Sequence, residues 1–204
     1  MNAWAWTALL LHLGWTAFAF GVRAAQQRHR TGDAGFRGIS GRPGQPSWWA
    51  GVLFVAALLG GLASPTAALA GLPPLPGTDA PALHWSGLAI TLAGLAGTVA
   101  AQTNMGTSWR VGVDPGERTA LVTDGLFAHV RNPVFTAMAT ASLGLTLIVP
   151  NWVSLTALAA LVIAIQLQVR VVEEPYLTAV HDPDYAGYTT RTGRFLPGIG
   201  RRTP

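Results

Sequence analysis

Five long apolar segments, none with an Asp, Glu, Lys or Arg, limit what this chain can fold into. They cover residues 4–22, 48–72, 84–102, 133–150 and 151–169. A helix rises about 1.5 Å per residue, so most of these segments can cross the roughly 30 Å of hydrocarbon in a bilayer. We therefore predict an all-α fold, a transmembrane bundle of five spans. The last two segments abut at Pro150 and Asn151, which predicts a tight helical hairpin.

The basic residues alternate between the connections. All 13 are arginines, and they fall in the first connection, the third connection and the C-terminal tail. The second connection carries no arginine and a single acidic residue, Asp79. The positive-inside rule then predicts an outside N-terminus and a cytoplasmic C-terminus, so the functional residues should face the cytoplasm. Because the Arg-, Ala- and Gly-rich composition is typical of a GC-rich genome, we expect a bacterial cytoplasmic membrane.

The composition excludes several kinds of chemistry. Only 11% of the residues are charged, against roughly 25% in soluble proteins, so we assign the net charge of +4 to topology and anionic headgroups, with no nucleic-acid partner. The chain has no Cys and no Lys, which excludes disulfides, thiolate nucleophiles, zinc–sulfur sites and Schiff bases. No metal site is predicted, because no ligand-like spacing links the five histidines, His12, His29, His84, His129 and His181.

The chain divides into two predicted parts, three N-terminal spans in residues 1–103 and a functional core in residues 104–204. In the third span small residues recur every four positions and predict a helix-packing face: Ala89, Ala93, Gly97 and Ala101. In the core, Asn132 and Pro133 have the residue types of an N-cap and a first helical position. Such a helix start would offer free N–H groups to an anionic ligand, although Asn-Pro can also simply begin a helix.

Two adjacent carboxylates, Glu173 and Glu174, directly follow the last apolar segment. A Glu pair near a membrane is unfavourable unless it faces a partner or a polar cavity. Arg170 precedes them by three and four residues, so a regular helix would place it on their face. The alternative is a solvated helix end with an ordinary ion pair.

Five short motifs follow one another in the second half of the chain. They are Leu-Val-Thr-x-Gly-x-Phe at 121–127, Arg-Asn-Pro-x-Phe at 131–135, Glu-Glu-x-x-Leu at 173–177, Tyr-x-x-Tyr at 185–188 and Arg-Phe-x-Pro at 194–197. Their order around a predicted hairpin resembles the isoprenylcysteine carboxyl methyltransferase family of integral membrane methyltransferases. Two places depart from the family pattern. Asn132 stands where relatives have His, and His181-Asp182-Pro183 stands where an aromatic-Gly pair is more usual.

The resemblance implies that S-adenosylmethionine is the methyl donor and S-adenosylhomocysteine the product. It also implies that the cofactor binds at the cytoplasmic ends of the last spans, capped by the C-terminal tail. Carried over by position, the cofactor-binding residues are Thr119, Ala120, Leu121, Val122, Phe127, Asn132, Pro133, Val134, Phe135 and Glu173. In relatives an arginine just before the Glu pair contacts the acceptor, which implies this role for Arg170.

The chemistry of such a donor adds further candidates. Its carboxylate suits Arg131, Arg194 or a helix N-terminus, and its ammonium suits either glutamate of the pair. Adenine needs an apolar slot with aromatic faces. The candidates for that slot are Phe127, Phe135, Tyr185 and Tyr188.

We therefore predict methyl transfer to a lipophilic acceptor that enters from the bilayer. A carboxylate acceptor needs only orientation by an arginine, whereas an amine or thiol acceptor needs a base, for which Glu174 is the candidate. One alternative is a membrane-embedded NADPH-dependent reductase. The other alternative is a non-catalytic lipid-handling membrane protein. The predicted spans contain no charged residue and no evident inverted repeat, which does not favour a transporter.

Overall fold

The computed structural model describes residues 2–114, 116–118 and 120–202, and all regular structure within them is helical. The elements are, in chain order, α1 (Asn2–Thr16), η1 (Ala17–Val22), α2 (Arg23–Thr31), α3 (Pro46–Leu69), α4 (Pro81–Asn104), η2 (Gly106–Ser108), η3 (Gly125–Ala128), α5 (Pro133–Ile148), α6 (Trp152–Leu167), η4 (Gln168–Glu173), α7 (Glu174–His181) and α8 (Asp184–Arg191). η1 and η4 are π-helical, whereas η2 and η3 are 3₁₀ turns. The described residues contain isolated β-bridges but no strand, so the all-α prediction is confirmed.

Four helical stretches of the described chain are long and apolar enough to cross a membrane. They are Asn2–Thr31, Pro46–Leu69, Pro81–Asn104 and Trp152–His181. The apolar helix α5 has only 16 residues, or about 24 Å of rise, which is shorter than a hydrocarbon core. Four of the five predicted spans therefore meet the length requirement, and a fifth span at α5 stays a prediction.

The helices pack in two close pairs, α5 along α4 and α6 along α3. In the first pair the backbones approach closely at glycines, because a Cβ added to Gly94 would lie 2.3 Å from the backbone nitrogen of Ala141. The buried face of α4 carries Gly87, Thr91, Gly94, Thr98 and Ala101. The predicted small-residue face was partly wrong, since Ala89 and Ala93 are exposed.

The turn between α5 and α6 is only three residues long, Val149 to Asn151. Asn151 caps α6, because its Oδ1 accepts from the backbone N–H of Ser154 at 2.9 Å. The Asn151 side chain also donates to the carbonyl of Ser64 in α3 at 3.1 Å. This turn is thereby fixed both to its own helix and to a neighbouring one.

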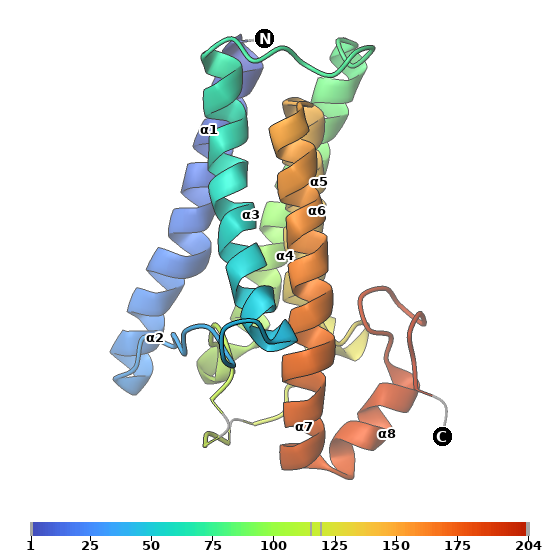
Figure 1. Cartoon of the computed structure of the whole chain (residues 1–204). Coiled ribbons are helices and arrows are strands. Elements are labelled where there is room, and N and C mark those ends of the chain that lie inside the picture. The colour runs from blue at the N-terminus through green and yellow to red at the C-terminus, as the bar shows by residue number, and fades with distance from the viewer. Residues whose placement is uncertain (1, 115, 119, 203–204) are drawn as a thin grey trace.

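Figure 1 shows that the connections separate into two groups at opposite ends of the bundle. The N-terminus and the α3–α4 connection lie at one end, whereas α2, the 105–132 segment, α7 and α8 lie at the other. The arginine-bearing connections gather at this second end. The predicted division at residue 103 falls in the last turn of α4 and stays a prediction.

Candidate functional site

A cavity of about 230 Å³, called the main cavity below, lies at the arginine-bearing end of the described chain. Its walls come from η1, α3, the segment between α4 and α5, the start of α5, and η4, α7 and α8. Segments more than a hundred residues apart in the sequence thus surround one hollow. Its size and position make it the strongest candidate for a binding site in the described part of the chain.

Most of the residues predicted for the site from the sequence line the main cavity. They are Ala120, Leu121, Val122, Phe127, Arg131, Asn132, Pro133, Val134, Phe135, Glu173, Glu174, Tyr185 and Tyr188. Thr119 lies outside the described residues. Arg170 and Arg194 are not on the cavity wall.

The start of α5 forms part of the wall. Pro133 occupies the first helical position and Asn132 the N-cap position, as predicted, but the Asn132 side chain makes no capping hydrogen bond. Instead its Nδ2 donates to the carbonyl of Arg194 at 3.0 Å, and its backbone N–H donates to the same carbonyl at 3.2 Å. Thr136 Oγ1 donates to the carbonyl of Phe195 at 2.8 Å. Asn132 thus joins the helix N-terminus to the C-terminal tail.

Glu174 is buried at the centre of an arginine cluster. Its Oε1 accepts from Arg131 Nη2 at 3.0 Å and from Arg194 Nε at 2.7 Å. Its Oε2 accepts from Arg194 Nη2 at 3.0 Å and from Arg202 Nη2 at 3.4 Å. Each of these bonds stabilises the ionised carboxylate, so Glu174 is poorly suited to remove a proton from a substrate.

Arg131 extends this cluster to the backbone of the tail. Its Nη1 donates to the carbonyls of Thr189 and Thr192, at 3.1 and 2.7 Å, and its Nη2 donates to the carbonyl of Gly200 at 3.1 Å. The Arg131 Nε is buried without a hydrogen-bond partner among the described residues. Arg131 therefore holds the tail in place while it also forms part of the cavity wall.

Glu173 has a very different environment from its neighbour. It is half-buried on the cavity wall, and its Oε1 accepts from Gln168 Nε2 at 3.3 Å. Arg110, also on the wall, attracts it electrostatically. Of the two carboxylates, Glu173 is the one with acceptor capacity left for a bound cation.

The π-helical turn η4 explains why Arg170 is away from the site. A π-helix bonds residue i to i+5, so its turns are wider and residues three apart, such as Arg170 and Glu173, lie farther from a common face than in an α-helix. Arg170 is exposed, and its Nε donates to Gln166 Oε1 at 2.8 Å. The expectation that Arg170 would lie beside the two glutamates was therefore wrong, because it assumed a regular helix.

Two tyrosines of α8 and Phe127 of η3 form an aromatic corner of the cavity. The Tyr188 hydroxyl donates to the Phe127 carbonyl at 2.6 Å, and the Tyr185 and Tyr188 ring centres lie 6.2 Å apart. Burial, with the charge of Glu174 added, raises the pKa of Tyr185 to about 12. Its hydroxyl consequently stays protonated at neutral pH.

The segment between α4 and α5 is fastened on both sides. Trp109 is buried, Val111 pairs with Phe36 of the α2–α3 connection, and Glu117 forms an ion pair with Arg37 at 2.6 Å. On the other side the Tyr176 hydroxyl of α7 donates to the carbonyl of Glu117. This segment, which carries Leu121 and Val122, is thus fixed against both halves of the molecule.

One side of the main cavity is apolar and was missed from the sequence. It consists of Phe20 from η1, Phe54 from α3 and Met138 from α5, and the two phenylalanine rings meet edge to face at 6.1 Å. These residues sit inside apolar runs, where nothing distinguishes them from lipid-facing neighbours. A signal did exist for Gln168, a polar residue at the end of an apolar run, and for Trp109, which belongs to the unusually polar segment after α4.

The sequence model of the phospholipid methyltransferase family matches residues 82–184, just over half of the chain. The match begins in α4 and ends at the start of α8, so it contains most of the cavity wall. No curated protein matches the chain. The matching family includes integral membrane methyltransferases of the isoprenylcysteine carboxyl methyltransferase type, which confirms the resemblance seen in the motifs. The chain therefore belongs to the phospholipid methyltransferase family.

Proposed function

We propose that this protein transfers a methyl group from S-adenosylmethionine to a lipophilic acceptor at the cytoplasmic face of a membrane. Its family is one of methyltransferases that act on membrane substrates. The observation that carries the finer proposal is the main cavity, whose wall combines charged and aromatic residues with an apolar cluster from the transmembrane helices. A nucleoside donor and a lipid acceptor require that combination.

The polar side of the cavity suits S-adenosylmethionine group by group. Glu173 would hold the ammonium, for which it has the remaining acceptor capacity. The N-terminus of α5 and the unpartnered Arg131 Nε would attract the carboxylate. Phe127 and Tyr185 would offer aromatic faces to adenine. The residues present therefore fit the cofactor.

The apolar side suits the hydrocarbon part of an acceptor. Phe20, Phe54 and Met138 come from helices that are embedded in the apolar bundle. The hydrocarbon tail of an acceptor that lies against these residues need not leave the bilayer interior. The arginine-rich connections gather at this end of the molecule. Under the positive-inside rule that end faces the cytoplasm, where S-adenosylmethionine is available.

When bound, S-adenosylmethionine supplies an electrophilic methyl group on a sulfonium. The acceptor's lone pair would form the new bond to the methyl carbon while the carbon–sulfur bond breaks, and an amine or thiol would also give up a proton. The protein's task is to hold the two partners in line at about 3–3.5 Å and to exclude water. Glu174, paired with three arginines, would act by positioning the tail. Arg110, on the wall, replaces Arg170 as the arginine proposed to orient a carboxylate acceptor.

Ligand binding to the purified protein tests this proposal. Calorimetry in detergent should detect binding of S-adenosylhomocysteine and no binding of NADPH. The protein should then transfer label from methyl-labelled S-adenosylmethionine to a component of a membrane lipid extract. NADPH binding without S-adenosylhomocysteine binding would instead support a reductase, and binding of neither would remove the enzymatic proposal.

A further inference from the structure

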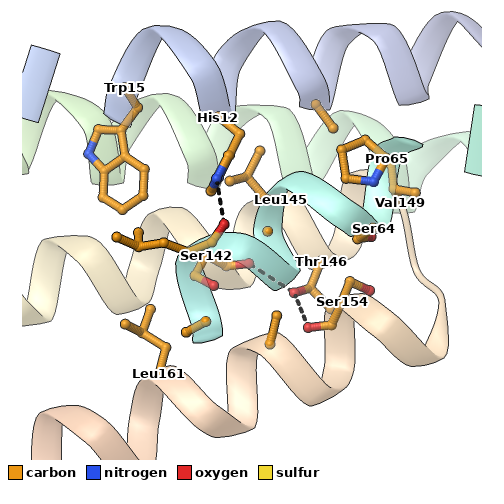
Figure 2. A pocket seen from close by; sticks show the side chains of 15 residues that line it. His12, Trp15, Ser64, Pro65, Ser142, Leu145, Thr146, Val149, Ser154 and Leu161 are labelled. Carbon is orange, nitrogen blue, oxygen red and sulfur yellow. Dashed lines mark hydrogen bonds between the residues drawn. The ribbon is translucent and has the colours of Figure 1, made fainter. Parts of the chain in front are cut away.

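A second, smaller cavity of about 30 Å³ lies inside the helical bundle, away from the main cavity. It is enclosed by α1, α3, α5 and α6, and Figure 2 shows polar groups from all four helices around it. These groups belong to His12, Ser64, Ser142, Thr146 and Ser154. In a region otherwise lined by apolar side chains, this concentration of polar atoms needs an explanation.

His12 has one satisfied ring nitrogen and one that is left over. Its Nε2 lies 3.0 Å from the backbone carbonyl of Leu58 (Figure 2). Since a carbonyl can only accept, Nε2 must carry the proton, and Nδ1 of the neutral ring is then an acceptor. His12 is only 4% exposed, and its Nδ1 is buried without a hydrogen-bond partner among the described residues.

A second acceptor in the same place comes from the backbone of α3. Pro65 lies inside this helix, and proline has no N–H to donate to the carbonyl four residues earlier. That carbonyl belongs to Gly61, which also lines the small cavity and lies directly against the His12 ring. The unpaired His12 nitrogen and the turn of α3 that lacks this N–H donor therefore belong to residues that line the same small cavity.

Three of the four nearby hydroxyl groups donate to other acceptors, and none donates to His12 Nδ1 among the described residues. Thr146 Oγ1 donates to the carbonyl of Ser142 at 2.9 Å, and Ser154 Oγ donates to the carbonyl of Asn151 at 2.8 Å. Ser64 Oγ donates to Asn151 Oδ1 at 3.2 Å. Leaving an acceptor unpaired in a medium without water has a large free-energy cost. A small molecule that donates two hydrogen bonds would remove that cost.

We propose that the small cavity is a binding site for water, which donates to His12 Nδ1 and to the Gly61 carbonyl. A cavity needs roughly 10–15 Å³ to hold one water molecule, so 30 Å³ accommodates one or two. The water links α1 to α3 beside the hydroxyl of Ser142 on α5. It acts as an integral part of the bundle, independent of methyl transfer.

Magnetisation transfer from water tests this site directly. The protein is labelled with ¹⁵N-histidine and placed in lipid bilayers, and solid-state NMR records the transfer from water protons to each histidine ring. The His12 signals are assigned by their loss in His12→Gln. We expect clear transfer to the His12 ring, together with nitrogen shifts of a neutral ring protonated at Nε2 and hydrogen-bonded at Nδ1.

A matched pair of substitutions locates the water. Ser142→Val replaces a hydroxyl with two methyl groups at the wall of the small cavity and should reduce the transfer to His12 several-fold. Ser86→Val makes the same change on the exposed face of α4 and should leave the transfer unchanged. Absence of transfer in the unmodified protein would mean a dry cavity, and transfer that persists in Ser142→Val would mean that the water lies elsewhere. Either result overturns the proposal, and the first needs no variant to fold.

Discussion

The two adjacent glutamates at the junction of η4 and α7 should respond differently to the same substitution, one by a loss of stability and the other by a loss of ligand affinity. Glu174→Gln removes a charge that three arginines surround, whereas Glu173→Gln removes one that faces the main cavity with a single hydrogen bond, from Gln168. Glutamine keeps the shape of either side chain. The comparison therefore isolates the effect of charge at two neighbouring positions.

The magnitudes follow from burial. The Arg131 and Glu174 side chains are 2% and 6% exposed, and removal of one partner of such a buried pair costs about 3–5 kcal/mol. The Arg202 side chain, at 42% exposed, contributes little to this cost. For Glu173 the loss is one charge-assisted bond to the ligand ammonium, about 1.5–3 kcal/mol, or roughly 10- to 100-fold in affinity.

Two measurements on each variant separate these effects. Thermal unfolding in detergent should show a lower melting temperature for Glu174→Gln, with faster proteolysis or amide exchange of the 182–202 tail. Glu173→Gln should melt like the unmodified protein. Calorimetry with S-adenosylhomocysteine should show weaker binding for Glu173→Gln, and weaker binding for Glu174→Gln only in proportion to its loss of tail structure.

Either of two results would refute this reasoning. A Glu174→Gln variant with an unchanged melting temperature would mean that the arginine cluster does not hold the tail. A Glu173→Gln variant that binds S-adenosylhomocysteine at full affinity would mean that the ammonium contact is assigned to the wrong carboxylate.

Three further substitutions test the packing and the limits of the site. Gly94→Ala places a methyl group 2.3 Å from the Ala141 backbone nitrogen, and we expect a loss of about 1–3 kcal/mol in thermal unfolding. Gly14→Ala, which meets nothing within 4 Å, should show no such loss. Arg170→Ala should leave S-adenosylhomocysteine affinity unchanged in calorimetry, because Arg170 is outside the main cavity; weaker binding would contradict its placement. Phe54→Ala should widen the apolar side of the main cavity and shift methylation toward bulkier acceptors in a competition assay. An unchanged preference would mean that the apolar side does not contact the acceptor.

The sequence predicted the helical fold and most of the polar cavity wall for physical reasons that act locally. Apolar runs without charges indicate helices in lipid wherever they occur. Motifs such as the one that contains Asn132 and Pro133 combine a helix start with a turn, so their meaning depends little on distant residues. The Glu pair was noticeable because carboxylates beside an apolar run are costly.

The failures arose where tertiary packing decides the outcome. Arg170 was misplaced because the sequence does not reveal a π-helical turn, which increases the angle between residues three apart such as Arg170 and Glu173. Ala89 and Ala93 are as small as the residues that do pack, but the buried face of α4 follows Gly87 and Gly94, where the backbone of α5 comes closest. Phe20 and Phe54 face the cavity only because η1 and α3 meet there.

The π-helical turn η4 also has a consequence for how such a protein can change by insertion and deletion. A π turn uses about one residue more than an α turn to cover nearly the same angle, so loss of one residue between Gln168 and Glu173 would restore α-helical hydrogen bonding and leave the faces before and after it nearly in register. The apolar helix α6 would still insert and pack on α3, and both glutamates would stay on nearly the face that they now present to the main cavity. A one-codon deletion is therefore expected to be tolerated in this turn, whereas the same deletion inside a regular α-helical span would turn every later residue by about 100°.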